Sequence, residues 1–356
     1  GAIRNETCFD DIMLQPRVLS NVGTRSLTTR FLGREYGLPF GIAPMGMCNL
    51  ACPDADAHIA RIAKGRQMPV CLSSAGSSSL RDMNSWSGGM AWFQLYFGQS
   101  VESSLLAADR ARDAGYDTLI LTVDVPEVSR RIRDQKNDFN LPFKMTPNAF
   151  LDFALHPRWS LSTLANGIPK PRNFADQHKG FDRKASRAGA NWAFLETLRE
   201  RWTGRLIVKG ITSPKDAKRA QDLGVDAIYV SNHGGRQLDS APPAINLLPI
   251  IRRAVGSDFP LLFDSGIRNG EDVIKALVLG ADFVMLGRPV LFALAAAGRS
   301  GLDSLLQCFV EDIDLVMAQI GVSKIDEIGP QALFTDTAQT LHPKLIPSPE
   351  PLSAAT

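Results

Sequence analysis

The amino-acid sequence predicts an α/β fold, a (β/α)8 TIM barrel with a long insertion after its fourth strand. Eight short apolar segments alternate along the chain with amphipathic helical patterns, which is typical of a closed parallel barrel. Polar residues follow nearly every apolar segment, as expected where strand ends carry a site. An open doubly wound sheet, the main alternative, usually has a G-x-G-x-x-G motif after its first strand, and the sequence lacks one there.

The expected strands are short runs of apolar residues. They lie at residues 38–43, 69–72, 91–96, 118–123, 206–208, 227–230, 261–263 and 283–286. Helical patterns fall between them at residues 55–64, 101–114, 192–202, 214–223, 246–255 and 270–279. Pro214 suits a first helical turn, and Ser213 before it suits the N-cap. Because such a barrel commonly uses about 250 residues as one domain, we expect residues 1–356 to form a single domain.

The connection between the fourth and fifth strands, from Val125 to Arg205, is far longer than an ordinary crossover. Within it, residues 139–190 form the expected insertion, which is rich in proline, aromatic and basic residues. A loop of this length is usually a lid or a binding segment. Its composition also suits a membrane-surface anchor, and a surface excursion packed on its own side chains is the alternative.

Composition narrows the classes of function. The net charge of +2 gives no reason to expect a nucleic-acid partner. Five cysteines, an odd number, indicate reduced thiols and a cytoplasmic protein. Cys48, Cys52 and His58 lie close in sequence, but no second Cys/His pair completes four ligands, so no metal is expected. Neither a signal peptide nor a membrane-spanning run is visible, so any membrane contact is expected to be peripheral, on the inner face.

The turn after the expected strand at 227–230 combines a base with an anion-binding cation. His233 accepts a proton near neutral pH, and Arg236 can hold a carboxylate through a bidentate pair. Gly234 and Gly235 allow the backbone to turn tightly between them. A capping turn with a structural histidine is the alternative for this segment taken alone.

Other strand ends add groups that suit the same site. Asp124 can orient the His233 ring and stabilise its protonated form. Arg131 and Arg236 can hold one small carboxylate, and Tyr96 adds a hydroxyl donor. Lys209, at the end of the fifth strand, is either a Schiff-base nucleophile, a cation beside a developing anion, or a surface lysine.

The last two strands are followed by Asp264-Ser265-Gly266-Ile267-Arg268 and by Gly287-Arg288. Barrels commonly bind a phosphate at these two turns, through backbone N–H groups and nearby cations. The pair of turns therefore predicts a phosphorylated ligand or cofactor, and two turns with surface arginines are the alternative.

Together these residues resemble those of the FMN-dependent L-2-hydroxy acid oxidase and dehydrogenase family, with mandelate- and bacterial lactate-type dehydrogenases as the nearest members. The matching strings run in family order over nearly the whole chain: Phe93-Gln94-Leu95-Tyr96, Leu121-Thr122-Val123-Asp124, Val208-Lys209-Gly210, residues 231–239, Asp264-Ser265-Gly266 and Gly287-Arg288. In that family, a helical segment with a second active-site tyrosine is expected before the position of Gly1, so that substrate contact is assigned to no residue here.

The resemblance implies FMN as the cofactor and a role for each matching residue. The residues expected to act on the substrate are His233 as base, Asp124 behind it, Arg131 and Arg236 at the carboxylate, Tyr96 at the substrate oxygen, and Lys209 beside the reduced flavin. The residues expected around FMN are Pro44, Met45, Gly46, Ser73, Gln94, Thr122, Lys209, Ser231, Asp264, Gly266, Arg268, Gly287 and Arg288.

Gly46 and Ala75 bear on the reaction subtype. Family oxidases commonly carry Ala at the position of Gly46, so we expect a dehydrogenase that passes electrons to a quinone or another carrier. Ala75 replaces the Trp of glycolate oxidase and leaves room for a mandelate- or lactate-like side chain. The alternatives are an oxidase that reduces O2 to hydrogen peroxide, a non-catalytic FMN-binding barrel and a Schiff-base aldolase using Lys209. A homotetramer is expected by analogy.

Overall fold

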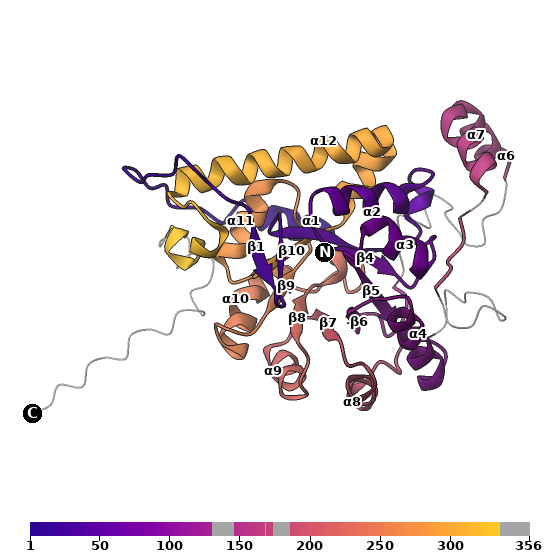
Figure 1. The fold of residues 1–356 in the computed structure, drawn as a ribbon, viewed down its shortest axis with the longest axis horizontal. Helices are drawn as coiled ribbons and strands as arrows, with labels where there is room; N and C mark the ends of the chain where they lie inside the picture. Colours follow the sequence, from indigo (N-terminus) through magenta and orange to yellow (C-terminus); the bar gives the residue numbers. More distant parts are fainter. Residues whose placement is uncertain (130–145, 168, 174–185, 335–356) are drawn as a thin grey trace, which may run out of the picture.

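A closed barrel of eight parallel strands forms the centre of the molecule (Figure 1). The structure is a computed structural model that describes residues 1–129, 146–167, 169–173 and 186–334. The strands are β3 (Phe40–Met45), β4 (Val70–Ser73), β5 (Ala91–Tyr96), β6 (Thr118–Thr122), β7 (Arg205–Ile211), β8 (Ala227–Val230), β9 (Leu261–Phe263) and β10 (Phe283–Leu286). Each strand pairs with the next, and β10 closes the barrel against β3, which confirms the predicted fold and all eight strands.

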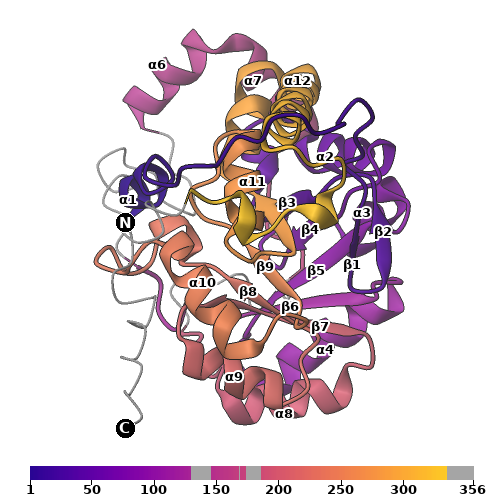
Figure 2. The same ribbon diagram turned by 90° about the vertical axis from the view of Figure 1, so that its left-hand side faces the viewer.

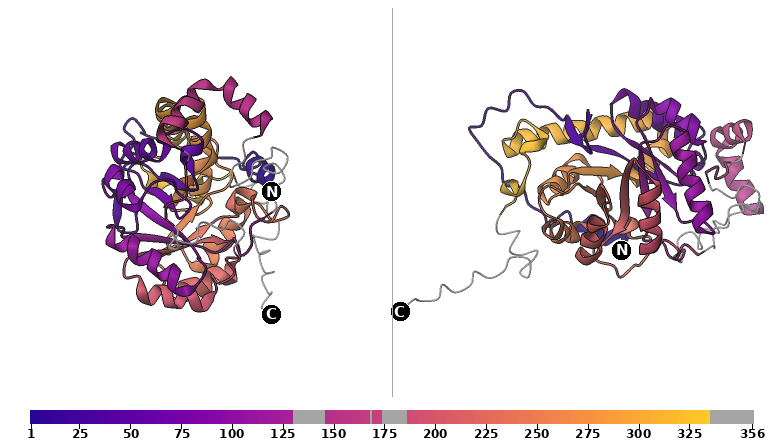
Figure 3. Two further views of the ribbon diagram at one scale, coloured as in Figure 1. Left: turned by 90° about the vertical axis from the view of Figure 1, so that its right-hand side faces the viewer. Right: turned by 60° about the horizontal axis from the view of Figure 1, so that its bottom comes forward.

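Helices surround the barrel on its outer face (Figure 3). They are α2 (Ala55–Gly65), α3 (Leu80–Ser87), α4 (Val101–Asp113), α8 (Trp192–Arg201), α9 (Pro214–Asp222), α10 (Ala244–Val255), α11 (Gly270–Val278) and α12 (Arg288–Ile320). Ser100, Ser213 and Asn269 cap three of them through side-chain oxygens that accept a backbone N–H of the first turn. The six predicted helices are present with nearly the predicted bounds, whereas α3 and α12 were not predicted.

The inward side chains of the barrel form an apolar core at one end. Because side chains alternate along a strand, Trp92 and Phe283 point inward while their neighbours face the helices. The antiparallel hairpin of β1 (Thr29–Phe31) and β2 (Arg34–Tyr36) closes this end, since the Phe31 ring lies 5.2 Å from that of Phe283. Sequence analysis missed the hairpin, whose strands of three residues are too short to show a period.

Towards their carboxyl ends the same strands place polar side chains inside the barrel. These buried residues are Ser73, Gln94, Thr122, Lys209, Ser231 and Asp264. A polar layer therefore lies above the apolar core, at the end of a parallel barrel where ligands bind.

Two helices lie in the insertion between β6 and β7, where sequence analysis placed a loop. α6 (Pro147–Leu155) and α7 (Pro157–Asn166) stand away from the barrel (Figure 2). Trp159 connects them to it, because its Nε1 donates a hydrogen bond to the Leu50 carbonyl at 3.1 Å. No helix in the described ranges combines the length and apolar character needed to cross a membrane.

Candidate functional site

A cavity of about 510 Å3 opens at the carboxyl ends of the strands. The predicted site residues in its wall are Pro44, Met45, Gly46, Ser73, Tyr96, Lys209, His233, Arg236, Asp264, Gly266, Arg268, Gly287 and Arg288. Four others lie directly behind the wall: Asp124, Gln94, Thr122 and Ser231. Arg131 lies outside the described residues.

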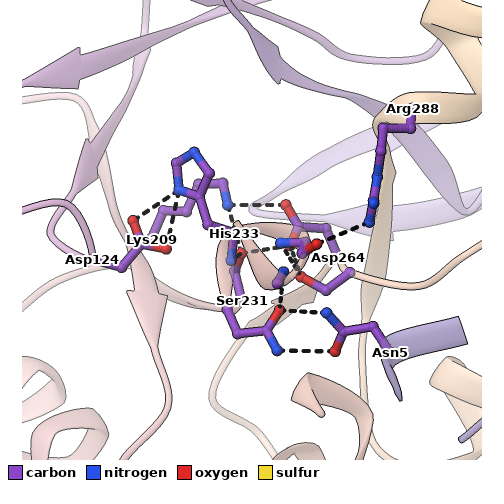
Figure 4. A network of polar contacts seen from close by, with 11 residues as sticks. Asn5, Asp124, Lys209, Ser231, His233, Asp264 and Arg288 are labelled. Carbon is purple, nitrogen blue, oxygen red and sulfur yellow. Dashed lines mark hydrogen bonds and ion pairs between the residues drawn. The ribbon is translucent and has the colours of Figure 1, made fainter. Parts of the chain in front are cut away.

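His233 and Asp124 form a close imidazole–carboxylate pair (Figure 4). His233 Nδ1 lies 3.0 Å from Asp124 Oδ1 and 3.2 Å from Oδ2, and both side chains are largely buried. Because the carboxylate accepts the proton on Nδ1, Nε2 on the other edge of the ring is left as the proton acceptor. The pair thus presents an oriented base beside the cavity.

The backbone that carries this base adopts a conformation that costs free energy. His233, Gly234 and Gly235 have φ values of +58°, +65° and +70°, in the left-handed region that a histidine rarely occupies. Side-chain oxygens hold the three successive N–H groups, with distances of 3.0 Å for each. The acceptors are Ser231 Oγ, Ser265 Oγ and Asn232 Oδ1.

Lys209 is a buried cation with a fixed partner. Its Nζ lies 2.9 Å from Asp264 Oδ2 and 2.7 Å from Ser231 Oγ. Burial alone would raise the pKa of Asp264, but the Lys209 charge and hydrogen bonds from neighbouring hydroxyls outweigh it and hold that pKa below its usual value. Lys209 is therefore not a surface lysine, and its Nζ is held by a carboxylate and a hydroxyl inside the barrel.

Two arginines converge on a single carboxylate at the turns after β9 and β10. Glu6 of α1 (Ala2–Thr7) accepts a hydrogen bond from Arg268, and its Oε1 lies 3.9 Å from Arg288 Nη1. Burial lowers the pKa of Arg288, and the charge of Arg268 acts in the same direction. This corner keeps an excess of positive charge, which suits a phosphate group.

Gly266 lets the chain pass close to α1 in the same corner. Its φ is +103°, and a Cβ on it would lie 2.1 Å from the Asn5 carbonyl oxygen. Asn5 in turn exchanges two side-chain hydrogen bonds with Asn232, at 2.8 and 2.9 Å. The first helix is thereby tied to both the arginine corner and the turn that carries His233.

Among the six residues of the polar layer, two buried side-chain atoms have no partner within the described part of the chain. They are Gln94 Nε2 and Thr122 Oγ1. Ser73 Oγ donates to Gln94 Oε1 at 2.7 Å, which leaves the amide nitrogen as the unsatisfied end. A buried polar group without a partner costs roughly 1–3 kcal/mol, so such groups indicate a bound ligand that offers them hydrogen bonds. A flat heteroaromatic ring with nitrogen and oxygen atoms along its edge fits these requirements.

The chain matches the family described as FMN-dependent dehydrogenase over residues 1–335. It belongs to the FMN-dependent dehydrogenase family. FMN is accordingly its cofactor, and the arginine corner and the unpaired polar groups fit a phosphate at one end and a heteroaromatic ring at the other.

Relatives of this FMN-dependent dehydrogenase cover nearly all of the chain. It is 37% identical over 355 residues to (S)-mandelate dehydrogenase of Pseudomonas putida, covering 96% of this chain and 89% of that protein. It is 36% identical over 349 residues to L-lactate dehydrogenase of Pseudomonas syringae pv. syringae (strain B728a), with coverages of 94% and 90%. A crystal structure of the monotopic membrane protein (S)-mandelate dehydrogenase superposes with a TM-score of 0.86 and 37% identity, with coverages of 94% and 91%.

Sequence analysis missed several residues of this family member's cavity region. Glu6 is separated from Arg268 by 262 positions, and no local pattern links them. Arg187 lines the cavity from the far end of the insertion, again without a local signal. Ser265 accepts a hydrogen bond from Gly234 N–H. It stands between Asp264 and Gly266, two predicted site residues, and this position was a signal for it in the sequence.

Proposed function

We propose that this chain catalyses the FMN-dependent oxidation of an L-2-hydroxy acid to the corresponding 2-keto acid. The observation that carries the proposal is the His233–Asp124 pair, whose base faces a cavity that Arg236 also lines. A base and a guanidinium in one cavity are what an anionic hydroxy acid requires, because its carboxylate must be held while a proton is removed.

In this proposal the residues of the chain divide between two tasks. Arg268 and Arg288 would hold the FMN phosphate, while Ser73, Gln94 and Thr122 would bind the ring. Bound FMN would supply the acceptor for two electrons and for the second hydrogen that leaves the substrate. Arg236 binds the substrate carboxylate, and Tyr96 donates its hydroxyl to the substrate oxygen. His233 Nε2 takes a proton from the substrate, and Asp124 stabilises the imidazolium that forms.

Two small residues at the cavity support a dehydrogenase for aromatic or medium-sized acids. A Cβ on Gly46 would lie 3.1 Å from Ala75 Cβ, so the two positions face each other across a narrow gap. The two relatives described above, from Pseudomonas putida and Pseudomonas syringae, are named as dehydrogenases of mandelate and lactate. We therefore assign a mandelate- or lactate-like substrate and a quinone or another carrier as electron acceptor, with an O2-using oxidase as the alternative.

Anaerobic mixing of the FMN-loaded protein with (S)-mandelate, L-lactate and glycolate tests this function. The visible flavin band should bleach with at least one acid and recover slowly when air is admitted. Rapid recovery with hydrogen peroxide formation would make the protein an oxidase. A band that none of a wider set of L-2-hydroxy acids bleaches would refute the proposed activity.

Replacing Arg236 should weaken substrate binding. Arg236→Met removes a charge-assisted hydrogen bond of about 1.5–3 kcal/mol, so we expect Kd for the substrate to rise roughly 10- to 100-fold. Stopped-flow flavin reduction at increasing substrate concentration measures this Kd. Arg236→Lys, which keeps the charge, should recover part of the affinity. An unchanged Kd in Arg236→Met would remove Arg236 from the carboxylate site.

We also propose that the insertion, residues 139–190 of an otherwise single barrel domain, makes peripheral contact with a membrane. α6 and α7 expose a set of large apolar side chains: Phe150, Leu151, Leu155, Leu161 and Leu164. The similar mandelate dehydrogenase structure is described as a monotopic membrane protein, which supports the same arrangement here. Contact with the inner face from the cytoplasm would bring the cavity near a membrane-dissolved quinone, and the homotetramer stays a prediction.

Liposome binding should depend on this apolar surface. Replacing Phe150, Leu151, Leu161 and Leu164 together by Ser should lower the partition coefficient onto liposomes more than 10-fold, since each buried side chain contributes about 1.5–3 kcal/mol. The matched control replaces Leu106 of α4 and Leu315 of α12, which are also exposed but lie on the barrel's outer helices. Equal partition of the parent and the four-residue variant would contradict membrane contact through this surface.

A further inference from the structure

The far end of the insertion returns to the barrel and supplies a residue of the cavity wall. Arg187 N donates to the Pro126 carbonyl at 2.8 Å, and the Arg187 carbonyl accepts from Ala190 N at 3.1 Å. Gly189 packs directly on Phe97, since a Cβ there would lie 2.2 Å from Phe97 Cε1. These contacts fix the backbone of this segment, and the Arg187 side chain lines the cavity.

The Arg187 guanidinium lies over the ring of Tyr96. Its Cζ is 4.6 Å from the ring centroid, within the range of a cation–π contact. Tyr96 ends β5 and lines the same cavity, and its backbone N–H donates to Ser74 Oγ at 3.2 Å. The backbone of Tyr96 is therefore fixed by β5, and a cation covers one face of its ring.

A cation on this face has two physical consequences for a phenol. It restricts rotation of the ring, so that the hydroxyl keeps one direction in the cavity. It also draws electron density from the ring, which makes the hydroxyl a stronger hydrogen-bond donor to an oxygen that gains negative charge.

We propose that Arg187 is a positioning residue for Tyr96, a role that rests on the proposed oxidation of a 2-hydroxy acid. Through the ring, Arg187 directs and strengthens the hydrogen bond from the Tyr96 hydroxyl to the substrate oxygen. The insertion then serves the chemistry at its far end as well as the membrane contact at α6 and α7.

A double-mutant cycle tests this route. The variants are Arg187→Met, Arg187→Lys, Tyr96→Phe and the Arg187→Met/Tyr96→Phe pair, all loaded with FMN. Arg187→Met should slow flavin reduction by (S)-mandelate or L-lactate roughly 3- to 30-fold, mainly in the limiting rate and less in the apparent Kd. Arg187→Lys should recover part of this rate, because it keeps a cation near the ring. In the Tyr96→Phe background the effect of Arg187→Met should fall below about twofold.

A matched control is available on the outer surface. Arg219 of α9 lies over the ring of Trp192 with its Cζ 4.3 Å from the centroid, so Arg219→Met removes the same kind of contact far from the cavity. That variant should reduce its flavin at the parental rate. Thermal unfolding of every variant separates a loss of fold from a loss of rate.

The outcomes separate this inference from the proposed function. Parental reduction rates in Arg187→Met, or equal losses from Arg187→Met with and without the Tyr96 hydroxyl, would overturn the positioning role while leaving the activity intact. If no hydroxy acid reduces the parent, the activity fails instead. Oxalate titration, followed through the flavin spectrum, then tests Arg187 by itself. Binding should weaken several-fold in Arg187→Met only when Tyr96 is present, and additive losses would overturn the role.

Discussion

His233→Gln should abolish reduction of the flavin by substrate while FMN stays bound. Glutamine has a similar length and still offers an N–H to Asp124, but its amide cannot accept a proton near neutral pH. A general base contributes typically 10²- to 10⁴-fold to a rate, so we expect reduction to slow by at least about 100-fold. The arginine corner and Lys209 are untouched, so the flavin content should not change.

Anaerobic stopped-flow spectroscopy and the ratio of flavin to protein absorbance measure the two parts of this prediction. The matched control is His156→Gln, because the His156 side chain on the N-terminal side of α7 is 66% exposed and lies outside the cavity wall. That variant should react at the parental rate. Near-parental reduction in His233→Gln would show that another group removes the proton.

Among the single substitutions predicted for this chain, Lys209→Met should lower the free energy of unfolding most. The substitution leaves Asp264 buried without its cation, and breaking a buried pair on one side costs about 3–5 kcal/mol. Asp264→Asn in the same chain should restore much of this loss, since it removes the uncompensated charge. Lys218→Met provides the control, because Lys218 pairs with Asp222 on the exposed face of α9 and such pairs contribute about 1 kcal/mol or less.

The loss should also depend on pH with a defined sign. In the parent, the pKa of Asp264 lies below its unfolded value, so the pair contributes stability above about pH 4 and loses it as pH falls through the folded pKa. In Lys209→Met, burial becomes the dominant influence and raises that pKa. The difference in unfolding free energy between parent and variant should therefore be largest at neutral pH and shrink on acidification. A difference that stays constant with pH would contradict the charge-based explanation.

The sequence predicts the barrel because its signal is local. Each strand is a short apolar run that is followed by polar residues. In β8, for example, the apolar run Ala227–Val230 is followed by Ser231, Asn232 and His233. The β1–β2 hairpin and the 33-residue α12 lack such a signal, the latter because Ala297 and Gly298 interrupt its helical backbone. The two helices of the insertion do carry a local sequence signal. Thr146 caps α6, and Pro147 and Pro157 each stand in the first turn of a helix.

The candidate site is predictable to the extent that strand ends determine it. Lys209 lies near the carboxyl end of β7, His233 follows β8 and Asp264 follows β9, so a closed barrel brings the three together. Arg187 reaches the cavity wall, and Glu6 reaches the arginine corner, from segments outside the barrel. Their positions depend on tertiary packing, such as the Asn5–Asn232 pair and the Gly189–Phe97 contact, which no short stretch of sequence encodes.

The hairpin at the far end of the barrel has a consequence for how the protein can change. Phe31 and Tyr36 fill that end with aromatic side chains, while the residues that meet a ligand occupy the opposite end of the same strands. Positions such as Gly46 and Ala75 can therefore be diversified in a mutant library without disturbing the aromatic packing at the closed end of the barrel. Selection for a new acid at these two positions and selection for thermal tolerance in the hairpin act on different residues, so they can be carried out one after the other.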